Sequence, residues 1–296
     1  MPVKQKKPST REVEDQLRIF GKSHGLKCRE AHLESLLDST AGMTCLVIGG
    51  DGALHYHLGR RGGTWHAAER TSRAVDALRP FVDGEVHLVE TAPFPFEDGQ
   101  FDRILIVDLL EYIQDDHAFI AECHRALQPD GRLILHASSA KRGSVMRGVR
   151  RLLGVVDPPG RARRGYTNSE LFDVLKDGFD VEAVQGYGRF FAELADTLAR
   201  VGAAYLFAGT QAKSDAAAEP APGADREKVQ RYAAATYPFC WIAAWLDYLL
   251  FFTKGYYLVA RACRRIWKPR RTPVLHDGRS IAEATLKTKI GTAAPF

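Results

Sequence analysis

The chain has few cysteines, and they stand far apart in the sequence. None of the five forms a Cys-x-x-Cys pair with another, so the sequence suggests neither a zinc site nor a disulfide framework. We therefore expect no metal centre, and this use of cysteine is typical of a reducing compartment. The basic start of the chain, residues 1–16, is not followed by an apolar run, which argues against a secretory signal.

The chain also lacks a large excess of one charge, since its net charge is only +5. The small positive excess is concentrated in one part of the sequence. Residues 141–164 contain eight lysines and arginines. The stretch lacks the interleaved aromatic residues that are typical of nucleic-acid binding, so we expect no nucleic-acid partner. A solvated loop is the more ordinary interpretation of such a run, and a second lipid-facing patch is the alternative.

Apolar segments with strand and helix spacing alternate along the first two thirds of the chain. Strands are expected at residues 44–48, 64–68, 86–89, 104–107, 133–135 and 179–184, and helices at residues 29–37, 53–58, 72–79, 118–127 and 169–175. Strands separated by helices predict an α/β fold with a parallel, doubly wound sheet. The length of 296 residues leaves room for one such domain of about 170 residues with appendages.

The most informative stretch is residues 93–139. There a polar turn, a buried-type strand, an acidic residue, an amphipathic helix and a second strand follow one another. Its motif residues are Pro95, Phe96, Asp98, Phe101, Asp102, Asp108, Leu110, Glu111, Tyr112, Glu122, Arg125, Leu127, Pro129, Asp130 and Gly131. This ordered set resembles the second half of the nucleotide-binding domain of class I S-adenosylmethionine-dependent methyltransferases, in their small-molecule, type 11-like branch. The resemblance covers residues 41–185 and implies an enzyme with S-adenosyl-L-methionine as its cofactor.

The resemblance and the changes in composition divide the chain into five parts. Residues 1–40 are expected to form a basic N-terminal segment and a short helix, and residues 41–210 a Rossmann-like methyltransferase domain. Residues 211–230, rich in alanine and proline, read as a flexible linker. Residues 231–272 are expected to form an apolar, membrane-associated helical appendage with a basic end, and residues 273–296 a tail.

The first glycine-rich turn departs from the pattern D-x-G-x-G-x-G that the family usually has. In the run at residues 47–53, Gly49 fits the first glycine, and Asp51 stands in place of the second. We expect Gly50 and Gly52 to restore the turn in a shifted form, and Asp51 to face the amino group of the cofactor. Glycines at such a turn let the backbone approach the ligand closely.

Three further acidic positions follow predicted strands, where the resemblance implies contact with the cofactor. Glu69 ends the second strand and could accept hydrogen bonds from both ribose hydroxyls, although a solvated helix cap is the alternative. Glu90 and Thr91 end the third strand, where the family holds the adenine edge, and a plain surface loop is the alternative. Asp108 follows the fourth strand, where cofactor and acceptor meet, and it could instead cap a helix.

The catalytic candidates are Asp108 and His136. Methyl transfer from a sulfonium is an in-line displacement, in which the protein mainly aligns the acceptor. A general base is needed only when the acceptor must lose a proton. His136 lies near the end of the fifth strand and could serve as that base, with Tyr112, His55 and His57 as other candidates, although a structural role is the alternative for a single histidine there.

The apolar C-terminal segment allows three interpretations. Between residues 232 and 260 only Asp247 and Lys254 are charged, but a spanning helix would place Asp247 near the membrane centre at a cost of about 3 kcal/mol. An interfacial element agrees better with the tryptophans and tyrosines of the segment, and the basic residues after it would attract anionic lipid. A buried core or dimer helix is the third possibility. We expect peripheral membrane contact through residues 237–271.

These observations predict S-adenosylmethionine-dependent methyl transfer to a small or lipid-linked acceptor at the cytoplasmic face of the membrane. The alternative is a catalytically inactive, methyltransferase-like binding or scaffold protein, which would have no affinity for the cofactor. An NAD-dependent oxidoreductase fits less well, because its turn needs a third glycine that is missing here. The identity of the acceptor and the oligomeric state stay open at this point.

Overall fold

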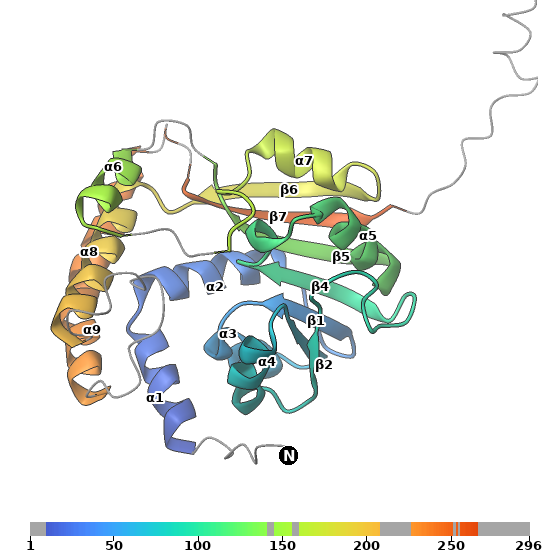
Figure 1. Cartoon of the computed structure of the whole chain (residues 1–296), viewed down its shortest axis with the longest axis horizontal. Helices are drawn as coiled ribbons and strands as arrows, with labels where there is room; N and C mark the ends of the chain where they lie inside the picture. Colours follow the sequence, from blue (N-terminus) through green and yellow to red (C-terminus); the bar gives the residue numbers. More distant parts are fainter. Residues whose placement is uncertain are drawn as a thin grey trace, which may run out of the picture. The chain divides into compact units, whose positions relative to one another are not determined.

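The computed structural model describes residues 10–140, 145–155, 160–207, 226–250, 253 and 255–265. These residues form a seven-stranded sheet in the order β3-β2-β1-β4-β5-β7-β6 (Figure 1). The strands are β1 (Thr44–Gly49), β2 (Thr64–Glu69), β3 (Val86–Leu88), β4 (Phe101–Val107), β5 (Leu127–Ser138), β6 (Phe179–Tyr187) and β7 (Tyr257–Arg264). Pairings among β1 to β5 are parallel, whereas β7 runs antiparallel to both β5 and β6.

Helices connect the strands and also extend beyond the sheet. They are α1 (Thr10–Gly21), α2 (His24–Leu36), α3 (Gly52–Gly59), α4 (Ser72–Leu78), α5 (Asp116–Ala126), α6 (Val145–Leu152), α7 (Asn168–Leu175), α8 (Phe190–Phe207) and α9 (Arg226–Leu246), with short 3-10 turns η1 (Arg79–Phe81), η2 (Leu110–Tyr112) and η4 (Asp247–Leu250). Side-chain caps explain several helix starts, because Thr71 caps α4, Asp115 caps α5 and Thr167 caps α7. In α7 the cap is a reciprocal capping box with Glu170.

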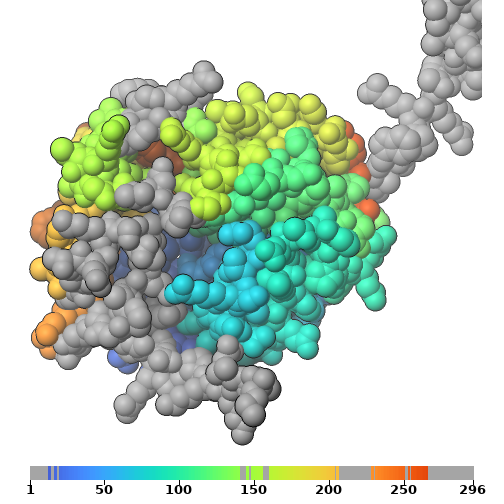
Figure 2. Space-filling view, in the orientation of Figure 1, coloured from blue at the N-terminus to red at the C-terminus, as the bar shows by residue number. Residues whose placement is uncertain are grey.

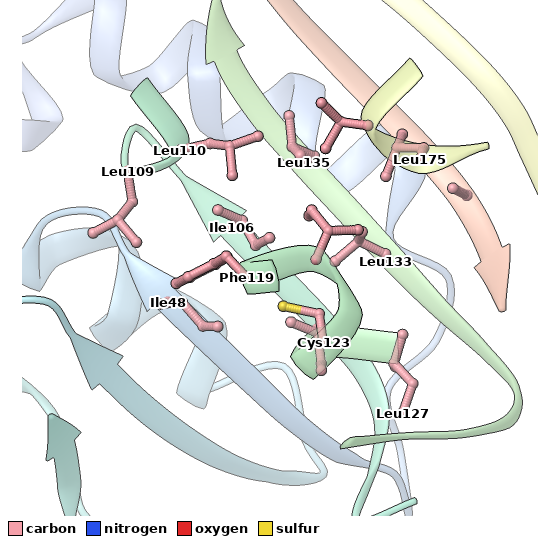
Figure 3. Packing of buried hydrophobic residues seen from close by; sticks show 14 of the residues in the cluster. Ile48, Ile106, Leu109, Leu110, Phe119, Cys123, Leu127, Leu133, Leu135 and Leu175 are labelled. Atoms are coloured by element: carbon pink, nitrogen blue, oxygen red, sulfur yellow. The ribbon is translucent and has the colours of Figure 1, made fainter. Parts of the chain in front are cut away.

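The sheet is buried on both faces, which explains why β4 reads as a continuous apolar run. Ile104 and Ile106 point to the face covered by α5 and α7, whereas Leu105 and Val107 point to the face covered by α2 and α3. Figure 3 shows Phe119 and Cys123 of α5 packed over the first of these faces, close to Ile106. The two clusters hold the carboxyl ends of β1, β2 and β4 in fixed positions, and the candidate site is built there.

The prediction for the C-terminal region was wrong in two respects. Helix α9 begins at Arg226, inside the predicted linker 211–230, and ends at Leu246. Residues 257–264, expected to be helical, form strand β7 between β5 and β6, so the sheet extends beyond residues 41–210 and is mixed rather than parallel. An apolar run alone does not distinguish a helix from a buried strand. The tail 273–296 and the basic residues after position 265 lie outside the described residues.

Asp247, in the middle of this apolar segment, has a structural role. Its carboxylate accepts hydrogen bonds from the backbone N–H groups of Arg189, at 2.9 Å, and Phe191, at 2.8 Å. It therefore caps the start of α8 and is only 6% exposed. Among the helices that the structure describes, none has the length and apolarity required to cross a membrane.

Candidate functional site

A pocket of about 330 Å³ opens at the carboxyl ends of β1, β2 and β4. It is lined by Arg29, Gly49, Gly50, Asp51, Glu69, Arg70, Thr71, Val107, Asp108, Leu109 and Tyr112. The pocket lies where the strand order reverses between β1 and β4, which is the place where open α/β sheets bind ligands. Its volume falls in the range of small-molecule sites.

The turn after β1 forms the floor of this pocket. Gly49 has a φ of 81°, and a Cβ atom there would lie 2.4 Å from the carbonyl oxygen of Val107. Only glycine fits, because the ends of β1 and β4 approach each other so closely. Asp51 follows as the cap of α3, where its carboxylate accepts a hydrogen bond from the N–H of Leu54 at 3.0 Å.

A buried histidine of α3, His55, forms a hydrogen bond with this turn. The Nε2 atom of His55 lies 2.8 Å from the carbonyl oxygen of Gly49, so the Nε2–H tautomer donates to it. The ring is 6% exposed. Burial lowers the pKa of His55 to about 4, since a charged imidazole would lose its hydration there.

Arg29 of α2 is the residue that sequence reasoning missed. Its Nη1 atom lies 2.7 Å from Oδ2 of Asp108, and its Nη2 atom forms an ion pair with Asp51. The side chain is 11% exposed. Burial opposes the charge of Arg29, but the carboxylates of Asp108 and Asp51 outweigh this effect and raise the pKa of the guanidinium. No local spacing could have predicted the contact, because α2 precedes β1 by several residues and reaches the pocket only through tertiary packing.

Asp108 connects the pocket to a buried chain of polar groups. Its Oδ1 atom lies 2.7 Å from Nδ1 of His136, and Nε2 of His136 lies 2.6 Å from the hydroxyl of Tyr187. Burial favours the neutral form of Asp108, but His136 and Arg29 outweigh it and hold the pKa of the carboxyl well below its usual range. Burial also raises the pKa of Tyr187. Asp108 caps no helix, since η2 begins without a side-chain cap and α5 is capped by Asp115.

The structure thus brings the two catalytic candidates together but gives them different exposure. The Asp108 side chain is 37% exposed toward the pocket, whereas His136 is 1% exposed. Both ring nitrogens of His136 face partners inside the protein. His136 therefore orients Asp108 and does not reach an acceptor in this structure.

Glu69 lies at the other end of the pocket. It ends β2, is 9% exposed, and accepts a hydrogen bond from the backbone N–H of Arg70 at 3.2 Å. Burial raises the pKa of its carboxyl. The alternative of a helix cap does not hold, because Thr71 caps α4. A carboxylate with one such hydrogen bond keeps several lone pairs for a ligand.

Some predicted residues are not among those that line the pocket. Glu90 and Thr91 are exposed and lie outside it. Gly52 is the first residue of α3, and a Cβ atom there would lie 2.4 Å from the ring of Phe81. Its role is therefore to let η1 pack against the start of α3. Gly49, Gly50, Asp51, Glu69 and Asp108 line the pocket, and their contact with a cofactor stays a prediction.

The basic stretch at residues 141–164 is partly built into the fold. Arg163 forms an ion pair of 2.7 Å with Asp116. Arg161 lies 3.6 Å from the buried carboxylate of Glu111 and donates a hydrogen bond of 2.9 Å to the hydroxyl of Ser138. These two cations hold the segment at 160–166 against the carboxyl ends of the strands, beside the pocket.

Comparison with known proteins agrees with this architecture. Residues 47–135 match a protein-family model described as a methyltransferase domain. A Bacillus halodurans C-125 protein provisionally assigned as a methyltransferase has a TM-score of 0.51 and 16% identity, over 80% of this chain and 98% of that one. No curated protein sequence gave a significant match.

Two further solved structures share the fold. The mycolic acid cyclopropane synthase CmaA1, in complex with SAH and CTAB, has a TM-score of 0.53 and 18% identity, over 81% of this chain and 84% of that one. The [4+2]-cyclase SpnF has a TM-score of 0.54 and 15% identity, over 83% of this chain and 85% of that one. The family match and the shared fold confirm the resemblance and the fold class inferred from residues 93–139.

Proposed function

Because this chain contains a methyltransferase domain with the class I S-adenosylmethionine-dependent fold, we propose that it transfers a methyl group to a small or lipid-linked acceptor at the cytoplasmic face of a membrane. The observation that carries the proposal is the charge pattern of the pocket. Arg29, Asp51 and Asp108 stand at one end, and the buried carboxylate of Glu69 stands at the other.

The first end of the pocket suits an amino acid zwitterion. The guanidinium of Arg29 would pair with the carboxylate of the methionine part of the cofactor. Asp51 and Asp108 would pair with its ammonium group. Asp51 would thus bind the ammonium group, which the glycine of the usual pattern could not do. Its charge is balanced by Arg29 of α2.

The second end of the pocket suits a ribose. Glu69 has free acceptor capacity, and its position at the end of β2 is the one from which an acidic residue binds ribose hydroxyls in nucleotide-binding α/β folds. A neutral hydroxyl is also a suitable partner for a carboxylate whose charge is disfavoured by burial. The residues present therefore fit the methionine part and the ribose of the cofactor.

S-adenosylmethionine supplies a methyl group on a positively charged sulfur. The contribution of the chain is to align the acceptor and to place negative charge near that sulfur. Asp108 suits the second role, because its low pKa keeps it ionised at neutral pH. The same low pKa makes Asp108 a weak base, and His136 acts as a positioning residue behind it. These groups favour an acceptor that needs no strong base from the protein.

One observation favours the alternative of an inactive binding or scaffold protein. Arg29 already satisfies Asp51 and Asp108 within the chain, so these ion pairs must rearrange before a zwitterion can bind. A domain that had lost its ligand could use the same pairs only to stabilise its fold. The two functions differ in cofactor affinity, which can be measured directly.

The test is calorimetric titration of the purified protein with S-adenosylmethionine, with Glu69→Ala and Glu90→Ala as paired variants. We expect micromolar binding by the natural protein. Glu69→Ala should weaken it by about 3 kcal/mol, or about a hundredfold, because two charge-assisted hydrogen bonds are lost. Glu90→Ala removes the same group from an exposed site at the end of the next strand and should leave affinity unchanged. A folded protein that binds no cofactor would establish the scaffold alternative.

The acceptor part of the proposal has its own test. Membrane lipid extract and a soluble small-molecule extract are each incubated with the protein and radiolabelled S-adenosylmethionine. Incorporation into the lipid fraction supports a lipid-linked acceptor. Incorporation only into the soluble fraction, by a protein that needs no detergent, would reject the membrane location.

A further inference from the structure

Six large apolar side chains are exposed on consecutive turns of α9 and η4. These residues, here called the aromatic face, are Phe239, Trp241, Ile242, Trp245, Tyr248 and Leu249. Their exposed fractions run from 49% for Ile242 to 75% for Tyr248. Isolated exposed apolar residues are normal on a protein surface, but a contiguous patch marks an interaction site.

The aromatic face is the exposed side of α9 and η4, and the opposite side of these helices packs against the rest of the protein. Val229, Cys240 and Asp247 are buried, and α9 lies along α8. Trp241, Trp245 and their neighbours recur at intervals of three and four residues, so they share the side opposite the buried one. Asp247 is the only charged residue among residues 237–250, and it is used to cap α8. The exposed side of this stretch therefore carries no charge.

A basic and apolar helix lies close by. Helix α6 contacts α8, and Arg150 forms an ion pair with the buried Glu193 of α8. On the outside of α6, Val145 is 66% exposed, Leu152 is 86% exposed, and Arg151 is exposed as well. Figure 2 shows α6 and α9 both reaching the surface on the left side of the molecule.

The described residues of α6 and of the stretch that follows it in the chain carry only positive charge. Residues 145–155 and 160–166 contain six arginines and no acidic residue. Arg150, Arg161 and Arg163 are engaged in ion pairs with the fold. Arg151 and Arg164 are exposed, and the ion pairs found among the described residues do not include them. They are free to meet an anionic partner.

We propose that the aromatic face inserts into the headgroup region of a bilayer that contains anionic lipids, with α6 contributing cationic contacts. Tryptophan and tyrosine are the residues that favour the boundary between lipid and water. The exposed arginines complement anionic headgroups. A second copy of the chain is a poorer partner, because a symmetric contact would bring the same arginines toward each other.

This inference refines the membrane contact named in the proposed function and rests on that part of it, but not on cofactor binding. The sequence predicted contact through residues 237–271. Among the described residues we narrow this surface to residues 239–249, because Leu258, Val259 and Ala260 of β7 are buried inside the sheet. Residues 266–271 lie outside the described residues. A bilayer cannot reach them while the sheet is intact.

The test is co-sedimentation of the full chain with phosphatidylcholine vesicles, with and without phosphatidylserine. The Trp241→Ser/Trp245→Ser double variant is compared with Phe172→Ser, which removes an aromatic ring of 56% exposure from α7. We expect the double variant to lower partitioning by more than about tenfold, because each tryptophan buries a large apolar area in the interface. Phe172→Ser should bind like the natural protein. Arg151→Glu should weaken binding only when phosphatidylserine is present.

Several outcomes would overturn the proposal. One is the absence of vesicle binding by the natural protein, and another is equal binding by the double variant. A dimer that the double variant dissociates, without any vesicle binding, would show that a second copy covers the aromatic face. Calorimetry with S-adenosylmethionine on the same samples separates these results from a failure of the cofactor site. Retained cofactor binding, or unchanged urea unfolding if no variant binds cofactor, shows that the variants are folded.

Discussion

Replacing His55 by glutamine should make the stability of the protein less sensitive to acid. His55 is neutral and buried behind the glycine turn, with Nε2 donating to the carbonyl oxygen of Gly49 at 2.8 Å. Glutamine can donate to the same oxygen from its amide, but it does not titrate. The substitution therefore removes one protonation equilibrium while it keeps the hydrogen bond that supports the turn.

The magnitude follows from the shift of the pKa, which falls from 6.5 to about 4 on burial. Between these values the unfolded chain binds a proton at His55 and the folded protein does not, so acidification favours unfolding. The stability that His55 contributes is fully present above pH 6.5 and is lost as the pH falls through about 4. The total is about 3 kcal/mol, of which about 2 kcal/mol is already lost at pH 5.

The assay is urea unfolding at pH 8 and pH 5. The natural protein should lose about 2 kcal/mol more of its free energy of unfolding than His55→Gln does between these two values. The lower pH stays far above the range in which Asp108 takes up a proton, since the pKa of that carboxyl is held well below its usual range, so Asp108 contributes little to the difference. His117→Gln, on the exposed side of α5, is the matched control and should behave like the natural protein. If His55→Gln loses as much stability on acidification as the natural protein, the assignment of His55 as a buried neutral group is wrong.

Two other substitutions test the packing around the site by the same unfolding assay. Gly52→Ala should lower the free energy of unfolding by about 1–3 kcal/mol, because its Cβ atom would lie 2.4 Å from the ring of Phe81. Gly59→Ala is the control at the other end of α3, where an added Cβ atom would have no other atom within 4 Å, and it should be neutral or stabilising by up to about 1 kcal/mol. Equal losses of stability in Gly52→Ala and Gly59→Ala would contradict the steric argument. Asp247→Ala should cost about 1–2 kcal/mol as the cap of α8 is lost. Asp173→Ala is the control, because it removes an exposed ion pair and should cost less than about 0.5 kcal/mol. If Asp247→Ala costs no more than this control, the capping role is rejected.

The sequence predicts those parts of the fold that local pattern determines. Strands β1 to β4 and helices α3 to α5 lie close to their predicted positions, because their apolar runs are bounded by turns and caps. Local pattern also indicates that Glu69 and Asp108 lie near each other, since acids at the ends of parallel strands meet at one edge of the sheet, and both line the pocket there. Strand β7 could not be found in this way. Its pairing with β5 depends on contacts more than a hundred residues apart, and its apolar run continues that of α9.

Arg29 and His136 show the limit of the same reasoning at the site. Arg29 pairs with Asp108 across 79 positions of the chain, and nothing in its local spacing distinguishes it from the other basic residues of α2. His136 was predicted from its place near the end of β5, but its burial is set by Tyr187 and by the aromatic side chains packed around it. Position along a strand indicates which residues approach a pocket. Packing decides which of them face it.

The altered glycine turn and Arg29 are best understood together. At the position of Asp51 the family pattern has a glycine, which brings no charge. Here Asp51 adds a second carboxylate at the end of the pocket where Asp108 lies, and two such groups would repel each other without a cation. The guanidinium of Arg29 pairs with both and removes that repulsion. The departure in the turn therefore has its counterpart 22 positions earlier in the chain, so the turn cannot be judged degenerate from its own residues alone.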